Sequence, residues 1–368
     1  MQICVLTKDH YPALSTFLER QTQGFIPRDV WIDRFPVFWD DNPFFKKESD
    51  QRGWLILDDQ AHIRGFFGSI PMLYFYKGEE KIFAAASSWY VEPACHQHSL
   101  FLFRNFLKQD GQVQFCTTPS VQVTFIFKKM GFQSFQAGWL NEGYFFPIDP
   151  WEFSVFLRRK FFKNKTAFVI SSCLMPFLSM GVKIYQQLCR LKRKAKKETP
   201  YSIREINAFG EEYNHFWEKL RGQYDVLAVR NQKTLNTLFY GTSGLKSERK
   251  ILEIRKQKEL IGYVAVKEVV RPGEAEKNIR YYEMMDAALL EHNQDLFVEI
   301  IKAMECLAQK NRIAWLRIFP LLSEWESMMR QMGFLRMTKE FRFVYKGLPD
   351  LQGLNHWLTP IDGDRGFF

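Results

Sequence analysis

The chain has 368 residues, of which 46% are hydrophobic and 16% aromatic, and it carries a formal net charge of +10. This length exceeds what one ordinary domain needs, and the apolar content excludes a disordered chain, so we expect two domains with buried cores. Its six cysteines are scattered without a Cys-x-x-Cys pair, and no basic-then-apolar signal segment opens the chain. These features predict a protein of the reducing cytoplasm, without structural zinc or another metal site.

The first 82 residues predict a strand, a helix and an antiparallel hairpin. A short strand at 5–6 is followed by Thr7, the predicted cap of a helix with apolar residues on one face. The segment 31–45 is rich in aromatic residues, and we interpret its rings as core rather than as the wall of an acceptor cleft. Strands are predicted at 53–57 and 63–76.

Residues 83–132 predict a strand, a helix, a second strand and a second helix. Pro93 ends the first apolar run, because proline donates no hydrogen bond to a sheet. Ser99 is the predicted N-cap of the first helix, and Gly131 closes the second. The four elements are expected at 83–91, 100–107, 113–116 and 123–130, and a further strand is expected at 139–148.

This order resembles the GNAT superfamily of acyl-CoA N-acyltransferases. The resemblance is carried by Val91-Glu92-Pro93 at the strand end and by Gly131-Phe132 after the second helix. It implies a mixed sheet and a thioester donor gripped by the backbone of the strand that ends at Glu92. The residues that would contact the donor are Ser88, Tyr90, Val91, His96, Gln97, His98 and Ser99.

The sequence departs from the family at its most characteristic positions. Members usually hold the pyrophosphate of coenzyme A in a glycine-rich loop at a helix start, and the matching positions here are His96, Ser99 and Phe101. The family's frequent general acid, a tyrosine, falls on Phe127, and its asparagine partner falls on Ser120. A phenyl ring cannot protonate a leaving thiolate.

Two residues of the stretch 83–132 are candidates for catalysis. Glu92 ends the strand near the place where an amine would sit, and it is the predicted general base, directly or through water, or otherwise an edge charge. Ser120 either hydrogen-bonds the donor or caps the helix that follows Pro119. His96 and His98 are candidates for phosphate contact or proton transfer, with solvated loop histidines as the alternative.

Residues 151–199 have the most unusual composition in the chain. The stretch 158–198 holds twelve basic side chains and one acidic, so the basic balance of the protein is local to it. An apolar run at 167–184 lies between the basic ends. Pro176 and Lys183 interrupt that run, so a membrane-spanning helix is not predicted.

Two interpretations of this segment remain open. In the first, an interfacial helical hairpin rests on an anionic membrane surface through 158–197, and exposed apolar side chains insert into it. In the second, a helical pair joins the domains, packs its apolar face on them and leaves its charges in solvent. No zinc finger, helix-turn-helix or aromatic stacking strand is present in the sequence, so no specific nucleic-acid partner is expected.

The pattern of the first repeat returns after residue 200. The same order of elements ends in Gly333-Phe334, and the general-acid position falls on Met329. Asp286 is the third candidate catalytic residue, as the strand-end carboxylate of this repeat, or it caps a helix start. Strands are predicted at 202–206, 250–255, 260–267, 278–287 and 313–318, and helices at 211–220, 232–240, 296–308 and 324–332.

We therefore predict an α+β fold in which two tandem GNAT-like domains are joined by the basic and apolar helical segment. The predicted boundaries are 1–150 for the N-terminal acyltransferase domain, 151–199 for the linker, 200–346 for the C-terminal domain and 347–368 for a tail.

The resemblance implies an acyltransferase that moves an acyl group from acyl-CoA or an acyl-carrier protein to an amine or hydroxyl acceptor. The acceptor is a small molecule or a lipid-linked compound, and the location is the cytoplasm, peripheral on the inner face of the membrane. Two alternatives stay open: a non-catalytic tandem-GNAT scaffold, motivated by Phe127 and Met329, and an aminoacyl transferase similar to the Fem family, which also uses tandem GNAT domains.

Overall fold

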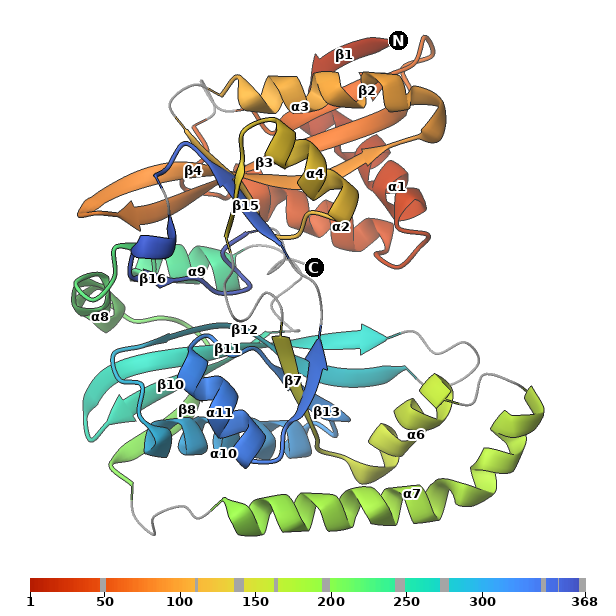
Figure 1. The fold of residues 1–368 in the computed structure, drawn as a ribbon. Helices are drawn as coiled ribbons and strands as arrows, with labels where there is room; N and C mark the ends of the chain where they lie inside the picture. Colours follow the sequence, from red (N-terminus) through yellow and green to blue (C-terminus); the bar gives the residue numbers. More distant parts are fainter. Residues whose placement is uncertain are drawn as a thin grey trace. The chain divides into compact units, whose positions relative to one another are not determined.

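The computed structural model of the protein describes residues 1–46, 51–109, 112–135, 142–161, 165–193, 199–241, 249–271, 278–338, 342–349 and 351–363. The chain forms two compact units, and each is built on a sheet with parallel and antiparallel pairs (Figure 1). Unit 1 comprises Met1–Gln136, Ala208–Ser247 and Phe341–Phe368, and unit 2 comprises Ala137–Asn207 and Glu248–Glu340. The predicted α+β class is confirmed.

The sheet of unit 1 has the strand order β1-β2-β3-β4-β5-β15-β6, and β9 joins it beside β3 and β16. Only the β4–β5 and β9–β16 pairs are parallel. The strands are β1 (Gln2–Val5), β2 (Gly53–Leu57), β3 (Ile63–Tyr76), β4 (Glu79–Val91), β5 (Val113–Cys116), β6 (Gln133–Phe135), β9 (Val226–Ala228), β15 (Phe343–Lys346) and β16 (His356–Trp357).

Helices of unit 1 cover this sheet and supply its aromatic core. The α-helices are α1 (Tyr11–Gln21), α2 (Arg28–Phe35), α3 (Ser99–Leu107), α4 (Val121–Lys129), α8 (Glu212–Arg221) and α9 (Gln232–Tyr240), and the short helical turns are η1 (Lys8–His10), η2 (Pro36–Asp40), η3 (Pro93–His98) and η5 (Leu351–Gly353). Phe103 of α3 and Phe127 of α4 pack with Phe67 of β3 in one buried cluster. Trp31 and Trp39 are fully buried, so the aromatic segment 31–45 is core as predicted.

The sheet of unit 2 has the order β14-β7-β13-β12-β11-β10-β8, in which only the β12–β13 pair is parallel. Its strands are β7 (Glu142–Pro147), β8 (Tyr201–Ile206), β10 (Arg249–Lys256), β11 (Glu259–Arg271), β12 (Ile279–Leu289), β13 (Trp315–Ile318) and β14 (Leu335–Thr338). Its helices are α6 (Pro150–Phe161), α7 (Lys165–Lys192), α10 (Gln294–Lys310) and α11 (Ser323–Gln331).

The two sheets repeat one strand order, with one exchange between them. Read from β1 and from β8, the strands correspond one to one in position and direction as far as β5 and β13. The next position holds β15 in unit 1 and β7 in unit 2, so each repeat gives the second strand after its last helix to the other sheet. β7 follows β6 in the chain, and β15 follows β14. This accounts for the tandem pattern in the sequence.

The helix ends that suggested the repeat have the same geometry. Gly131 has φ +85° and Gly333 has φ +81°, a region that favours glycine. The N–H of Phe132 donates to the Phe127 carbonyl, and the N–H of Phe334 donates to the Met329 carbonyl. Both helices therefore end in a Schellman motif with a phenylalanine after the glycine.

The compact units differ from the predicted domain boundaries. The strand expected to close the first domain is β7, which pairs with β13 and β14 in the sheet of unit 2. Residues 208–247 lie with unit 1, because β9 pairs with Tyr74–Tyr76 of β3. The predicted tail contributes β16 to unit 1, and the predicted linker contributes α6 and α7, which pack against each other in unit 2. Long-range strand pairing decides these assignments.

Candidate active site

The strand β4 separates from β5 halfway along its length. The two strands pair in parallel only from Phe83 to Ala85, so β4 continues toward Val91 without a ladder partner on that side among the described residues. The register between β3 and β4 shifts at this point. Ser88 has φ +54°, an uncommon conformation for a residue with a side chain, and it forms a β-bulge.

A cavity of about 540 Å³ lies where the strands separate. This size is in the range of pockets for small ligands and cofactors. Strand β4 forms one wall, and the end of β5 with the start of α4 forms another. The lining residues are Thr22, Phe25, Ile26, Phe67, Ala86, Ser87, Ser88, Trp89, Tyr90, Cys116, Thr118, Pro119, Ser120, Val123 and Phe127.

The cavity combines an aromatic wall with polar groups from the bulge. The ring of Trp89 stacks on Phe103 and meets Phe67 at 5.3 Å between centroids. The Oγ atoms of Ser87 and Ser88 lie 3.1 Å apart. The buried Nε1 of Trp89 has no acceptor among the described residues. This arrangement suits a ligand that is apolar with a few hydrogen-bonding groups.

Three solved structures with a similar fold are two of an acyltransferase and one of a protein described as a probable acyltransferase. Saccharomyces cerevisiae N-myristoyltransferase with bound myristoyl-CoA matches 100% of this chain and 83% of its own, at 10% identity and a TM-score of 0.58. A second crystal structure of that enzyme with myristoyl-CoA matches 95% and 83%, at 11% identity and a TM-score of 0.55. An Enterococcus faecalis protein of unknown function, described as a probable N-acyltransferase, matches 93% and 72%, at 10% identity and a TM-score of 0.54.

The chain has the GNAT fold. Its architecture is tandem-like, because the order of strands and helices that defines this fold is used in both sheets. No model of a known protein family and no curated sequence matches the chain. At these sequence identities the likeness concerns the fold, so the chemistry of the cavity has to be argued from its own residues.

Of the residues predicted to contact the thioester donor, some line the cavity of unit 1 and others do not. Ser88 and Tyr90 line the cavity, whereas Val91 packs at the edge of the aromatic core. His96, Gln97 and His98 lie in η3, which leads directly into α3, and they do not line the cavity. The Nε2 of His96 lies 3.2 Å from the carbonyl oxygen of Val91.

The start of α3 differs from the sequence prediction. Ser99 is the first residue of the helix and not its cap, and the preceding residue, His98, has helical backbone angles without a side-chain capping bond. The physical reason is that η3 already turns the chain from Pro93 onward. The polar side chains of this turn are mostly exposed.

Glu92 lies at the end of β4 in a network of ion pairs. Its Oε1 accepts a hydrogen bond from Arg20 at 2.5 Å, and its Oε2 accepts one from Arg64 at 3.0 Å. Arg64 also pairs with Asp58 at 2.9 Å. Glu92 does not line the cavity. To act as a base, its carboxylate would have to break one of its two arginine contacts and turn toward the acceptor.

Ser120 lines the cavity and caps α4, so both functions considered from the sequence apply to its position. Its Oγ accepts a hydrogen bond from the N–H of Val123 at 3.2 Å, which confirms the predicted N-cap. We expect Ser120→Ala to lower the free energy of unfolding by about 1 kcal/mol. Urea unfolding measures this loss, and Ser120→Asp should restore it because aspartate also caps helices. A loss of turnover in both variants would show that the hydroxyl itself acts on the donor.

Asp286 belongs to unit 2 and is not among the residues that line this cavity. It is fully buried and accepts a hydrogen bond from the Tyr263 hydroxyl at 2.5 Å. The register between β11 and β12 shifts next to it, as the register shifts at Ser88 in unit 1. The strand continues to Leu289, so Asp286 lies within β12 and caps no helix. The α10 helix is capped instead by Asn293.

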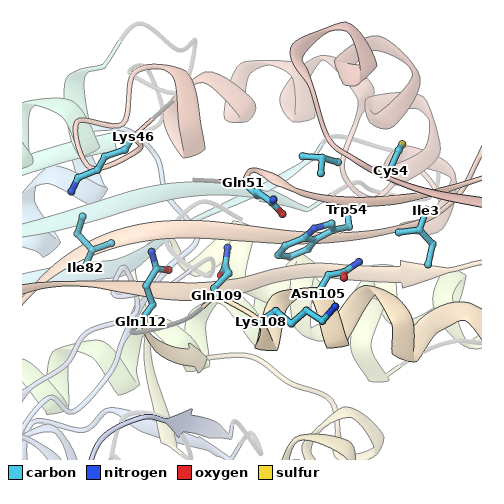
Figure 2. A pocket seen from close by; sticks show the side chains of 11 residues that line it. Ile3, Cys4, Lys46, Gln51, Trp54, Ile82, Asn105, Lys108, Gln109 and Gln112 are labelled. Atoms are coloured by element: carbon cyan, nitrogen blue, oxygen red, sulfur yellow. The ribbon is translucent and has the colours of Figure 1, made fainter. Parts of the chain in front are cut away.

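A second groove of about 610 Å³ in unit 1 has a different chemistry (Figure 2). Trp54 lies between β2 and α3 there, with Gln51, Asn105 and Gln109 around it. None of the described residues that line the groove is a carboxylate or a histidine. Burial raises the pKa of the Cys4 thiol, which keeps this group protonated. The titratable side chains of this groove are therefore the Cys4 thiol and the amines of Lys46 and Lys108.

Sequence reasoning missed part of the cavity wall. Cys116 could have been included, because it ends the strand that separates from β4 and is buried against the cavity. Phe25 and Ile26 come from the loop after α1, and no periodicity or motif in that loop indicates where it lies. Among the described residues, no group of three or more His, Cys, Asp or Glu side chains is placed to hold a metal ion.

Proposed function

We propose that unit 1 transfers an acyl group from a thioester donor to an amine or hydroxyl acceptor. The observation that carries the proposal is the separation of β4 from β5 over an apolar cavity of about 540 Å³. Backbone N–H and C=O groups of β4 face a space in which no strand competes for them, so they suit the amide groups of a pantetheine arm. The aromatic wall suits the acyl chain.

Acyl-CoA is the donor that the comparisons favour, since N-myristoyltransferase of this fold was solved with myristoyl-CoA. The turn at 93–98 lacks the glycines that let a backbone approach a pyrophosphate closely. An acyl-carrier protein or an aminoacyl-tRNA would make fewer demands on this turn. Mass spectrometry of the purified protein with matched acyl-CoA and acyl-carrier-protein donors separates these cases.

The reaction needs a proton acceptor and a proton donor. The acceptor nitrogen or oxygen attacks the thioester carbonyl, the C–S bond breaks, and the leaving thiolate takes up a proton. The acceptor loses its proton to a base, for which Glu92 is our proposal. Phe127 is buried in the cavity wall and carries no hydroxyl, so the proton that reaches the thiolate does not come from this position.

We expect Glu92→Gln to lower turnover by roughly 10² to 10⁴ fold and to leave donor affinity nearly unchanged. The amide keeps the shape of the side chain but loses its basicity. Steady-state kinetics and equilibrium donor binding measure the two quantities. His96→Ala should show the opposite pattern, with weaker donor binding and a smaller effect on turnover.

Asp58→Asn is the matched control for the ion-pair network. Asp58 shares Arg64 with Glu92 but lies in the β2–β3 turn, outside the cavity lining. The control should retain full turnover. Equal losses in Glu92→Gln and Asp58→Asn would mean that the position of Arg64 matters and that Glu92 is not the base.

A non-catalytic scaffold is the alternative, and Phe127 together with Met329 is the observation that favours it. Both occupy the general-acid position of their repeat, and both are buried apolar residues. A protein of this class binds no thioester donor in unit 1, or binds it without turnover. An aminoacyl transferase of the Fem type is distinguished by labelled aminoacyl-tRNA as the only productive donor.

The proposal also includes an acceptor and a cellular location for the enzyme. We infer a small-molecule or lipid-linked acceptor and a cytoplasmic protein attached to the inner face of the membrane, with residues 158–197 as the contact. None of the helices among the described residues is long and apolar enough to cross a membrane.

A further inference from the structure

Helix α7 is anchored to unit 2 along one face. Met175 and Cys189 are buried on this face. The amide of Gln186 donates to the carbonyl oxygens of Pro147 and Ile148, both at 2.8 Å. These buried contacts fix the rotation of α7 about its axis over the part of the helix whose side chains are described.

The opposite face of α7 carries a row of large apolar side chains in solvent. They lie three or four residues apart, so they form one stripe that covers about a third of the helix circumference and is roughly 26 Å long. Each is between 47% and 76% exposed. The members of this apolar stripe are Leu174, Phe177, Met180, Ile184, Leu188 and Leu191.

Charge decides what kind of partner fits the apolar stripe. Lys183 and Arg190 are exposed on α7, Arg190 also lies 3.9 Å from Glu305 of α10, and no acidic residue occurs in the sequence between Glu152 and Glu198. A second copy of the chain would bring these like charges together. An anionic lipid surface instead complements them and accepts the apolar side chains between its headgroups.

We propose that the apolar stripe of α7 binds an anionic membrane, with the helix axis parallel to the bilayer plane. The apolar side chains enter the boundary between headgroups and acyl chains, and Lys183 reaches the phosphates. Membrane binding deepens the proposed function, because a surface-bound enzyme can take a lipid-linked amine from the membrane. Only this choice of acceptor rests on the proposed function.

Flotation of the full-length protein with vesicles tests the proposal. Vesicles of phosphatidylcholine with 30% phosphatidylglycerol, on the order of a natural anionic fraction, should carry the protein upward at low salt and less at high salt. Phe177→Ser/Leu191→Ser should lower the bound fraction at least about tenfold, because these are the two most exposed members of the stripe. Lys183→Glu should weaken binding to anionic vesicles only.

Val270→Ser/Leu335→Ser is the matched control. It removes two exposed apolar residues of unit 2 that lie on strands β11 and β14, and it should bind vesicles as the natural chain does. Equal flotation of the α7 variant and the natural chain would overturn the proposal. The proposal would also be overturned if the natural chain did not bind vesicles. This includes the case in which sedimentation shows that the natural chain is a dimer and that the α7 variant is a monomer.

Activity separates this inference from the proposed function. With a water-soluble amine as acceptor, Phe177→Ser/Leu191→Ser should retain the turnover of the natural chain, because the cavity lies in unit 1. Loss of vesicle binding with turnover retained supports the membrane surface. Vesicle binding by a protein without any turnover also supports the membrane surface. That result counts only against the proposed acyl transfer.

Discussion

Replacing Val123 by tryptophan is expected to abolish donor binding while the fold remains intact. Val123 is half-buried in the first turn of α4 and lines the cavity between β4 and β5. An indole at this position fills the space that the pantetheine arm and the start of the acyl chain would occupy. We expect donor affinity to fall by at least about 100-fold, equivalent to roughly 2.7 kcal/mol.

Val121→Trp is the control for this experiment. Val121 is the same residue type in the same helical turn, but it is 61% exposed and does not line the cavity. Isothermal titration with a non-hydrolysable acyl-CoA analogue measures both variants, and circular dichroism checks that the helices are retained. If Val123→Trp binds the analogue as the natural chain does, the donor site lies elsewhere.

Removing the carboxylate of Asp362 is expected to destabilise unit 1 by about 3 to 5 kcal/mol. Asp362 is buried and pairs with the buried Arg230 at 2.5 Å. Its Oδ2 accepts a hydrogen bond from the N–H of Thr359, and its backbone carbonyl accepts one from Tyr74 at 3.0 Å. Asp362→Ala leaves a guanidinium in the protein interior without the charge that offsets its desolvation.

Urea unfolding measures the loss of stability. Hydrogen exchange at β15 and β16 shows whether the loss is confined to the C-terminal segment of unit 1 that contains these two strands. Asp59→Ala serves as the control, since that carboxylate is 95% exposed and its pair with the N-terminus is worth at most about 1 kcal/mol. Arg230→Met/Asp362→Leu should recover much of the stability, because a buried ion pair can be replaced by apolar side chains. Equal stability of Asp362→Ala and Asp59→Ala would contradict this account.

Local pattern was enough to predict most elements of the fold. The strands at 53–57, 63–76 and 113–116 and the helix at 232–240 were predicted within their observed bounds. Alternation, helical spacing and turn residues act over a few residues, so they are readable without the rest of the molecule. The repeat was readable for the same reason, because Gly131 and Gly333 both adopt the positive φ that ends a helix.

The candidate site was readable only in part. The resemblance to the GNAT superfamily placed Ser88, Tyr90 and Ser120 near a donor cleft, and all three line the cavity. Glu92 was predicted as a general base or an edge charge, and the sequence did not indicate that Arg20 and Arg64 come from distant parts of the chain to bind it. No local pattern specifies which side chains converge on a strand end.

The sequence by itself determined the element types, the repeated order and the basic, apolar character of 158–197. Tertiary structure alone decided that β7 and β15 change sheets, because β5 and β13 offer equivalent edges and only long-range packing selects the strand that covers each. It also decided which side of α7 is buried. Both Met175 and Phe177 are apolar, so periodicity alone cannot distinguish the face that packs on unit 2 from the apolar stripe in solvent.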